Sequence, residues 1–159
     1  MGALIGRHVF RIDKKGRISV PKQFRNFLSN QDFAGIFVYP SFKYPAIEAC
    51  GEIFVQRIID SLDDLELFSD QQDDIAATVL ENSYQLPYDT EGRVILPDPL
   101  LKHANISTDA VFVGRGNRFQ IWEPSAYEIQ NTAAFARARS RGVTLSLRDS
   151  NDGKNSNGD

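Results

Sequence analysis

The chain has 159 residues, 42% of them hydrophobic, which is enough to build the core of one domain or of two small units. Its single cysteine, Cys50, excludes an intrachain disulfide framework and a cysteine-ligated zinc cluster, and we expect a small buried or half-buried side chain there. No run approaches the roughly 18 apolar residues of a membrane span, and no signal peptide is recognisable, so we expect a cytoplasmic protein.

The net charge of −3 hides a strong asymmetry along the chain. Residues 1–30 hold seven Lys and Arg against one Asp, whereas residues 46–91 hold one Arg against twelve Asp and Glu. Five of the seven cations fall within eleven residues: Arg7, Arg11, Lys14, Lys15 and Arg17. This distribution predicts a basic pole and an acidic pole, with an ordinary mixed surface as the alternative.

One nine-residue pattern occurs twice. Residues 13–21 read DKKGRISVP, and residues 89–97, which begin 76 positions later, read DTEGRVILP. The Asp, Gly, Arg and Pro coincide, and so do two aliphatic positions. The chain is therefore predicted to contain two copies of one small unit that cannot bury its apolar face alone.

In the first copy, residues 8–12 alternate as a strand before the pattern begins. Asp13 is expected to open a turn through side-chain to backbone hydrogen bonds, and Gly16 supplies the positive φ that the turn needs. Residues 17–20 form a second strand, expected to complete a hairpin. Pro21 is then placed at the first position of a short helix, where a missing N–H is tolerated.

An apolar strand over 35–39, a turn over 40–45 and a helix over 52–64 complete the first copy. That helix presents an apolar face made of Ile53, Phe54, Ile58, Ile59 and Leu62. A shorter helix over 70–82 connects the two copies.

The second copy repeats this plan. Its equivalents are a strand over 84–88, the turn residues Asp89 and Gly92, Pro97 before a short helix, strands over 109–114 and 118–122 joined by a turn at 116–117, and a helix over 124–138. Only polar residues, Gly and Asp follow Arg148, so residues 148–159 are expected to form a disordered tail.

The other candidate residues are not expected to form functional sites. His8 and His103 lack neighbours at metal-ligand spacing, and the acids between 60 and 74 lack the spacing and the glycine of a calcium loop. No nucleophile or phosphate-loop motif is present. We therefore expect no catalytic residue, metal, cofactor or small-molecule substrate.

Two roles compete for Arg17 and Arg93. Each could contact DNA, through a phosphate or through the O6 and N7 atoms of a guanine. Alternatively, each pairs with the Asp four residues earlier and holds its own turn. Lys14 and Lys15 become Thr90 and Glu91 in the second copy, and a carboxylate repels phosphate, so the second copy is expected to bind DNA more weakly.

The duplicated Asp-x-x-Gly-Arg-aliphatic-x-aliphatic-Pro element, together with the FQIW strand at 119–122, resembles the MraZ family. The resemblance covers roughly residues 5–140. It implies an α+β fold of two swapped-hairpin units of the AbrB/SpoVT type, at 5–66 and 83–140, joined by a helix at 67–82. It also implies a homo-oligomeric ring of subunits.

The same resemblance implies a nucleoid-associated transcriptional regulator that binds double-stranded promoter DNA. Its site would be short G-rich direct repeats upstream of the division and cell-wall gene cluster, which includes its own gene. Arg11, Lys14, Lys15, Arg17 and Arg93 are the expected DNA contacts. The structural residues of the turns are Asp13, Gly16, Pro21, Asp89, Gly92 and Pro97. The alternative is an antitoxin-like or scaffold module whose basic hairpin meets an acidic protein.

Overall fold

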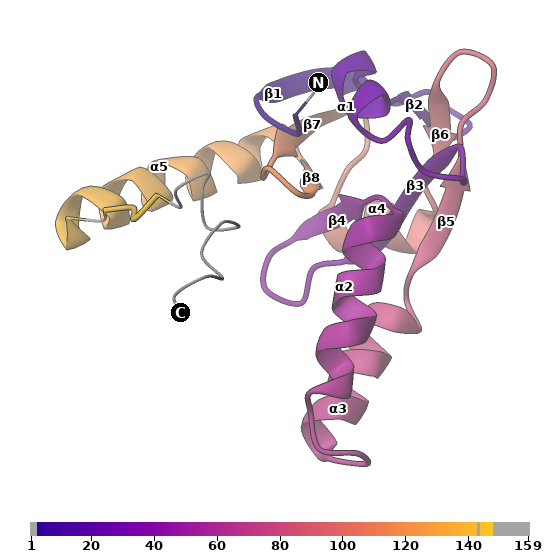
Figure 1. The fold of residues 1–159 in the computed structure, drawn as a ribbon. Coiled ribbons are helices and arrows are strands. Elements are labelled where there is room, and N and C mark those ends of the chain that lie inside the picture. Colours follow the sequence, from indigo (N-terminus) through magenta and orange to yellow (C-terminus); the bar gives the residue numbers. More distant parts are fainter. Residues whose placement is uncertain (1–2, 143, 148–159) are drawn as a thin grey trace, which may run out of the picture. The chain divides into compact units, whose positions relative to one another are not determined.

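The computed structural model describes residues 3–142 and 144–147 and has an α+β fold with two antiparallel sheets (Figure 1). The chain divides into two units, Met1–Glu128 and Ile129–Asp159, and both sheets belong to the first. The strands are β1 (Arg7–Arg11), β2 (Arg17–Ser19), β3 (Gly35–Pro40), β4 (Ala46–Cys50), β5 (Tyr84–Pro87), β6 (Arg93–Ile95), β7 (Asp109–Gly114) and β8 (Phe119–Trp122). The helices are α1 (Lys22–Phe27), α2 (Glu52–Asp63), α3 (Asp70–Ile75), the π-helical η1 (Ala76–Leu80), α4 (Asp98–Ala104) and α5 (Pro124–Arg141).

The order of the strands shows how the two copies combine. The larger sheet runs β1-β7-β8-β4-β3-β5, and the smaller one pairs β2 with β6. In the duplicated pattern β1 corresponds to β5, β3 to β7 and β4 to β8. Exchanging the copies therefore reverses the order and returns the same sheet, as expected of an internal duplication.

The predicted local hairpin is wrong. β1 and β2 do not pair with each other: β1 pairs with β7, and β2 pairs with β6 of the other copy. The alternation of apolar residues predicts a strand and its buried face, but it does not determine which strand lies beside it. Each copy therefore supplies strands to the ladders of the other.

Backbone hydrogen bonds tie each turn to the opposite copy. The N–H of Val20 donates to the carbonyl of Gly92 at 3.1 Å, and the N–H of Leu96 donates to the carbonyl of Gly16 at 2.9 Å. These two bonds are equivalent under the repeat. Neither turn is thus held by its own copy alone.

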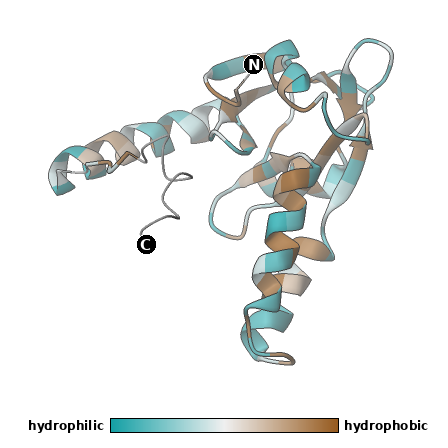
Figure 2. Ribbon diagram, in the orientation of Figure 1, coloured by the Kyte–Doolittle hydropathy of each residue, from teal (hydrophilic) through white to brown (hydrophobic). Residues whose placement is uncertain are grey.

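The hydrophobic core is shared by both copies. Phe24 from α1 and Phe119 from β8 are fully buried, with ring centroids 4.9 Å apart. Ile18 and Val94 cover this core from the β2–β6 pair, each 1% exposed. In Figure 2 hydrophobic residues run through the strands, whereas the loop between β5 and β6 is hydrophilic. Burial of apolar surface stabilises a fold by about 25 cal/mol per Å². Because side chains from both copies cover one another in this core, that stabilisation requires both copies.

The axis that relates the two copies passes between Glu48 and Gln120, which are Cα partners in the β4–β8 ladder. The Gln120 amide donates to Glu48 Oε1 at 2.7 Å, and both side chains are buried. The Trp122 indole donates to Gln120 Oε1 at 2.9 Å. A carboxylate paired with an amide suits this position, because two facing buried carboxylates would repel each other.

The predicted helices are present, with three corrections. Ile53 is 80% exposed and Ile59 is 38% exposed, so the inner face of α2 is formed instead by Phe54, Val55, Ile58 and Leu62. The predicted helix over 70–82 consists of two segments, the α-helix α3 followed by the π-helical η1. The predicted tail 148–159 lies outside the described residues.

The third correction concerns the two prolines. Pro21 and Pro97 lie one position before the first helical residue, with ψ of 134° and 141°. Their backbone is therefore still extended, and α1 and α4 begin at the next residue. A proline is tolerated at the first helical position and at the position before it, because neither needs an intrahelical N–H donor.

The exchange of strands predicts energetic coupling between the copies. The effects of Ile18→Val and Val94→Ala on the free energy of unfolding should not add. The double variant should differ from the sum of the single variants by at least about 0.5 kcal/mol, because the two side chains are directly opposite cross-strand neighbours. Chemical denaturation at fixed protein concentration measures this cycle. The control pairs Ile18→Val with Val79→Ala, since Val79 lies in a separate cluster, and should be additive. Additive effects in both double-mutant cycles would contradict the pairing of β2 with β6.

Candidate nucleic-acid interface

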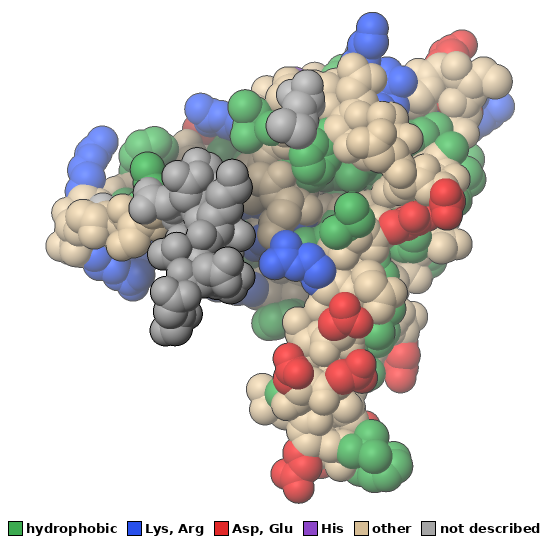
Figure 3. Space-filling model, viewed as in Figure 1, with side chains coloured by type: hydrophobic (Ala, Val, Ile, Leu, Met, Phe, Trp, Pro, Cys, Tyr) green, Lys and Arg blue, Asp and Glu red, His purple; other side chains and the backbone are tan. Residues whose placement is uncertain are grey.

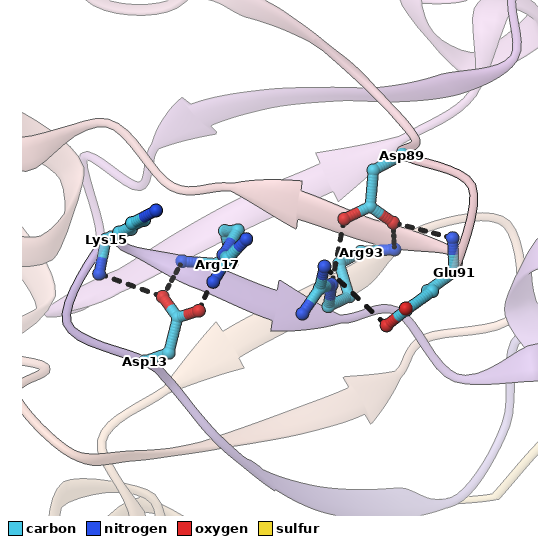
Figure 4. A network of polar contacts seen from close by, with 6 residues as sticks. All are labelled: Asp13, Lys15, Arg17, Asp89, Glu91 and Arg93. Atoms are coloured by element: carbon cyan, nitrogen blue, oxygen red, sulfur yellow. Dashed lines mark hydrogen bonds and ion pairs between the residues drawn. The ribbon is translucent and has the colours of Figure 1, made fainter.

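The β2–β6 ribbon carries the two duplicated arginines on one face. Arg17 is the Cα partner of Ile95, and Ser19 is the Cα partner of Arg93. Since side chains alternate along a strand, these four residues share the outer face, opposite the buried Ile18–Val94 pair. The sequence predicted each arginine on its own hairpin, but the structure brings both onto one ribbon (Figure 4).

The first turn is organised by the carboxylate of Asp13. Its Oδ1 accepts hydrogen bonds from the backbone N–H groups of Lys15 at 2.9 Å and Arg17 at 2.8 Å. Its Oδ2 accepts from Nε of Arg17 at 2.6 Å. The backbone N–H and then the side chain of Arg17 hold the pKa of the Asp13 carboxyl below its ordinary value. The structural role proposed for Asp13 from the sequence agrees with this geometry.

The second turn repeats this geometry but adds a carboxylate. Asp89 accepts from the backbone N–H groups of Glu91 and Arg93, each at 2.9 Å, and from Nε of Arg93 at 2.8 Å. Glu91 Oε2 lies 3.6 Å from Nη2 of the same arginine. The hydrogen bond that Arg93 donates to Asp89 is the largest cause that raises the pKa of Arg93. Arg93 is thus shared by two carboxylates, whereas Asp13 is the one carboxylate within 4 Å of the Arg17 guanidinium among the residues that the structure describes.

Both turn glycines have the predicted positive φ, +81° at Gly16 and +76° at Gly92. They differ in what surrounds them. A Cβ added to Gly92 would lie 2.5 Å from Cζ of Arg25, whose Nε donates to the carbonyl of Val20. Arg25 of α1 therefore lies over the second turn. No local pattern in the sequence predicted Arg25 there, because its place depends on the exchange of strands.

The remaining predicted contacts lie near the first turn. Lys14 and Lys15 are exposed within it. Arg11 is exposed at the end of β1, in the larger sheet, opposite Asp109 in the β1–β7 register. Lys14, Lys15 and Arg17 thus belong to one turn and its ribbon, while Arg11 belongs to the neighbouring sheet.

A dense group of acidic side chains lies away from the ribbon. Figure 3 shows Lys and Arg side chains over the end that holds α1, β2 and β6, and Asp and Glu side chains along α2 and α3. The acids of this helical pair are exposed, among them Asp60, Asp63, Asp64, Asp70, Asp73 and Asp74. The acids of α2 and α3 are therefore separated from the ribbon, whereas Asp13, Asp89 and Glu91 lie at its two turns.

Other candidate groups have structural surroundings. The His8 ring packs edge-on against Phe24 with centroids 5.2 Å apart, and Nε2 of His103 lies 3.2 Å from the carbonyl oxygen of Tyr44. Cys50 is fully buried, as predicted, and burial raises the pKa of its thiol to about 12. Among residues 3–142 and 144–147, no cluster of three or more potential ligands could hold a metal ion. In the same residues, no helix has the length and apolarity needed to cross a membrane.

The fold and the ribbon define an internally duplicated α+β protein in which two Asp–Arg turns meet on one two-stranded sheet. Residues 79–144 match the family model described as "MraZ protein, putative antitoxin-like". Proteins named transcriptional regulator MraZ are similar over much of their length. The one from Pelagibacter ubique is 47% identical over 118 residues, 74% of this chain and 76% of that protein. The one from Gluconacetobacter diazotrophicus is 43% identical over 148 residues, 91% and 92% of the two chains.

A third relative, from Rickettsia africae, is 37% identical over 145 residues, covering 91% of this chain and 97% of that protein. The chain belongs to the MraZ family. The predicted resemblance is thereby confirmed, and each of these relatives is named a transcriptional regulator.

The turn geometry predicts how Asp13 titrates. In the folded protein the Asp13 carboxyl should titrate below 3.8, its ordinary pKa, because its charged form accepts hydrogen bonds. A depressed pKa stabilises the fold at pH values above the unfolded pKa, and this contribution is lost as the pH falls through the folded pKa. Arg17→Ala should raise the pKa of Asp13 only part of the way towards its ordinary value, since the backbone N–H of residue 17 remains a hydrogen-bond donor.

Carboxyl ¹³C resonances followed by NMR between neutral and acid pH measure this titration. Asp89 is the internal control, because Arg93 holds its pKa low in the same way and Arg17→Ala leaves that pair intact. An unchanged Asp13 midpoint in Arg17→Ala would show that the side-chain bond makes no contribution.

Proposed function

We propose that this protein is a sequence-specific DNA-binding transcriptional regulator that reads promoter DNA through the outer face of the β2–β6 ribbon. The observation that carries the proposal is the placement of Arg17 and Arg93, both half-buried, on one face of the ribbon beside the exposed Lys14 and Lys15. A two-stranded ribbon fits the major groove, and arginine is the side chain that most often reads guanine there. The names of the relatives support regulation of transcription.

Each turn arginine is positioned for this role by its Asp. A guanidinium whose Nε is bound by a carboxylate keeps terminal N–H groups for a guanine edge, and a fixed fork loses less entropy on binding. Arg11, Lys14 and Lys15 would supply phosphate contacts, which position the protein and carry no sequence information. In this proposal Asp13, Gly16 and Pro21, with Asp89, Gly92 and Pro97, shape the ribbon.

We propose further that the protein assembles into a homo-oligomeric ring of swapped-hairpin units and acts in the cytoplasm at the nucleoid. A single ribbon offers few phosphate contacts, and repetition around a ring would raise its affinity through effective concentration. Large exposed apolar side chains away from the ribbon, such as Val9 and Phe68, offer surface for subunit contacts. The proposed target is G-rich direct repeats upstream of the division and cell-wall genes, including its own.

Replacing the two turn lysines tests the DNA role directly. Lys14→Ala with Lys15→Ala should weaken binding to all DNA sequences and reduce the slope of log K against log salt by up to about two units, since each lysine neutralises one phosphate. Fold stability should change little, because both side chains are exposed. Fluorescence anisotropy with promoter and scrambled duplexes over a range of salt concentrations measures both quantities.

The matched control removes two exposed cations elsewhere, Arg57→Ala with Lys102→Ala, and should leave the salt slope unchanged. A wild-type protein that binds DNA with no sequence preference, yet binds an acidic protein through the same lysines, would contradict the proposal. That result would favour an antitoxin-like or scaffold function.

The two arginines should contribute unequally. Arg17→Ala should cost about 1–3 kcal/mol of discrimination at one guanine, whereas Arg93→Ala should cost less. The reason is that Arg93 is shared by Asp89 and Glu91. Glu91→Lys should strengthen nonspecific binding, because it removes a carboxylate from the proposed DNA face. Competition between specific and scrambled duplexes, at fixed salt and with the oligomeric state checked, measures these effects.

Equal losses from the two substitutions would show that the turns are equivalent contacts and that the local carboxylates do not decide their strength. A larger loss from Arg93→Ala would contradict the charge argument altogether.

A further inference from the structure

The outer face of the ribbon contains one apolar residue that the Asp–Arg geometry does not explain. Ile95 is 59% exposed, whereas its neighbours on that face, Arg17, Ser19 and Arg93, are polar. Its counterpart in the first copy is Ser19, so the duplication does not require an aliphatic side chain here. The core does not need it either, because Val94 and Leu96 on each side are the buried residues of this segment.

The position of Ile95 is well defined. It is the Cα partner of Arg17, so the two side chains stand next to each other on the ribbon. Its Cγ2 atom lies 3.7 Å from where a Cβ on Gly16 would be, which places it against the first turn. Ile95 therefore stands beside the guanidinium proposed to read DNA. The equivalent place beside Arg93 is occupied by the smaller, polar Ser19.

An exposed isoleucine among cations has few uses on a DNA-binding face. It cannot contact phosphates favourably, because it has no hydrogen-bond donor. In the major groove, however, the C5-methyl group of thymine is an apolar feature that side chains read by direct contact. A branched aliphatic side chain covers such a methyl group well.

We propose that Ile95 is a specificity-determining residue that packs against a thymine methyl in the base pair next to the one read by Arg17. This inference rests on the DNA-binding function proposed above. Directly opposite residues of an antiparallel pair have Cβ atoms about 4.5–5.5 Å apart, between the rise of one base pair (about 3.4 Å) and that of two, so the side chains of Arg17 and Ile95 can reach adjacent base pairs. With Ser19 in the equivalent place, the two ends of the ribbon read different sequences, so the ribbon has one preferred orientation on DNA.

The test uses short duplexes selected from a randomised pool by the wild-type full-length protein. Each thymine of the selected sequence is replaced in turn by deoxyuridine, which removes only the methyl group. Wild-type protein should lose about fourfold in affinity at one thymine, the value expected for one buried methyl-sized group. Ile95→Ser should bind the parent duplex about fourfold more weakly and should be insensitive to deoxyuridine at that thymine. Ile95→Val should keep most of the sensitivity.

Ile53→Ala is the matched control, since Ile53 is an exposed aliphatic residue on α2, away from the ribbon, and should behave as wild type. Thermal unfolding and oligomer size are measured for each variant. A selected sequence with no methyl-sensitive thymine would overturn the inference, and so would an Ile95→Ser protein that keeps the sensitivity. Loss of the oligomer in Ile95→Ser would also overturn it, by making Ile95 a subunit contact. Failure to select any sequence would instead count against the proposed function.

Discussion

The structure depends on the pairing of β2 with β6, which joins the two copies of the repeat at their most similar segments. Each of these strands has only three residues, too few to form an independent sheet. They are held because Ile18 and Val94 close the shared core from one side. The carbonyls of Gly16 and Gly92 are also bound by the opposite copy. Neither copy could keep this geometry alone, so fold and ribbon form together.

The same pairing creates the candidate interface. Two Asp–Arg turns that are far apart in sequence become two ends of one ribbon, and each arginine is oriented by a carboxylate four residues earlier. Duplication supplies two similar turns, but their surroundings have diverged. Lysines lie in the first turn, whereas Glu91 and the guanidinium of Arg25 lie at the second. A symmetric scaffold thus presents an asymmetric surface.

The acidic half of the charge distribution is compatible with a DNA-binding ribbon because of where it lies. The exposed acids of α2 and α3 are carried on a helical pair that packs on the sheet through Phe54, Ile58 and Ile75, not through the ribbon. Exposed charges separated by more than about 8–10 Å are largely screened at physiological salt. A negative net charge therefore does not exclude a locally positive surface at the first turn.

Much of the local structure follows from the sequence alone. The repeated Asp, Gly and Arg determine both turns, because side-chain to backbone bonding and a positive φ are requirements of a few adjacent residues. Alternating apolar residues likewise determine the strands and their buried faces, and the family follows from the duplicated pattern. Only the tertiary structure decided that each strand pairs with the other copy, that Arg25 lies over the second turn and that Ile95 stands beside Arg17. Those outcomes depend on contacts between residues far apart in the numbering, from 46 positions for Val38 and Tyr84 to 106 for Arg7 and Val113. Local periodicity carries no information about such partners.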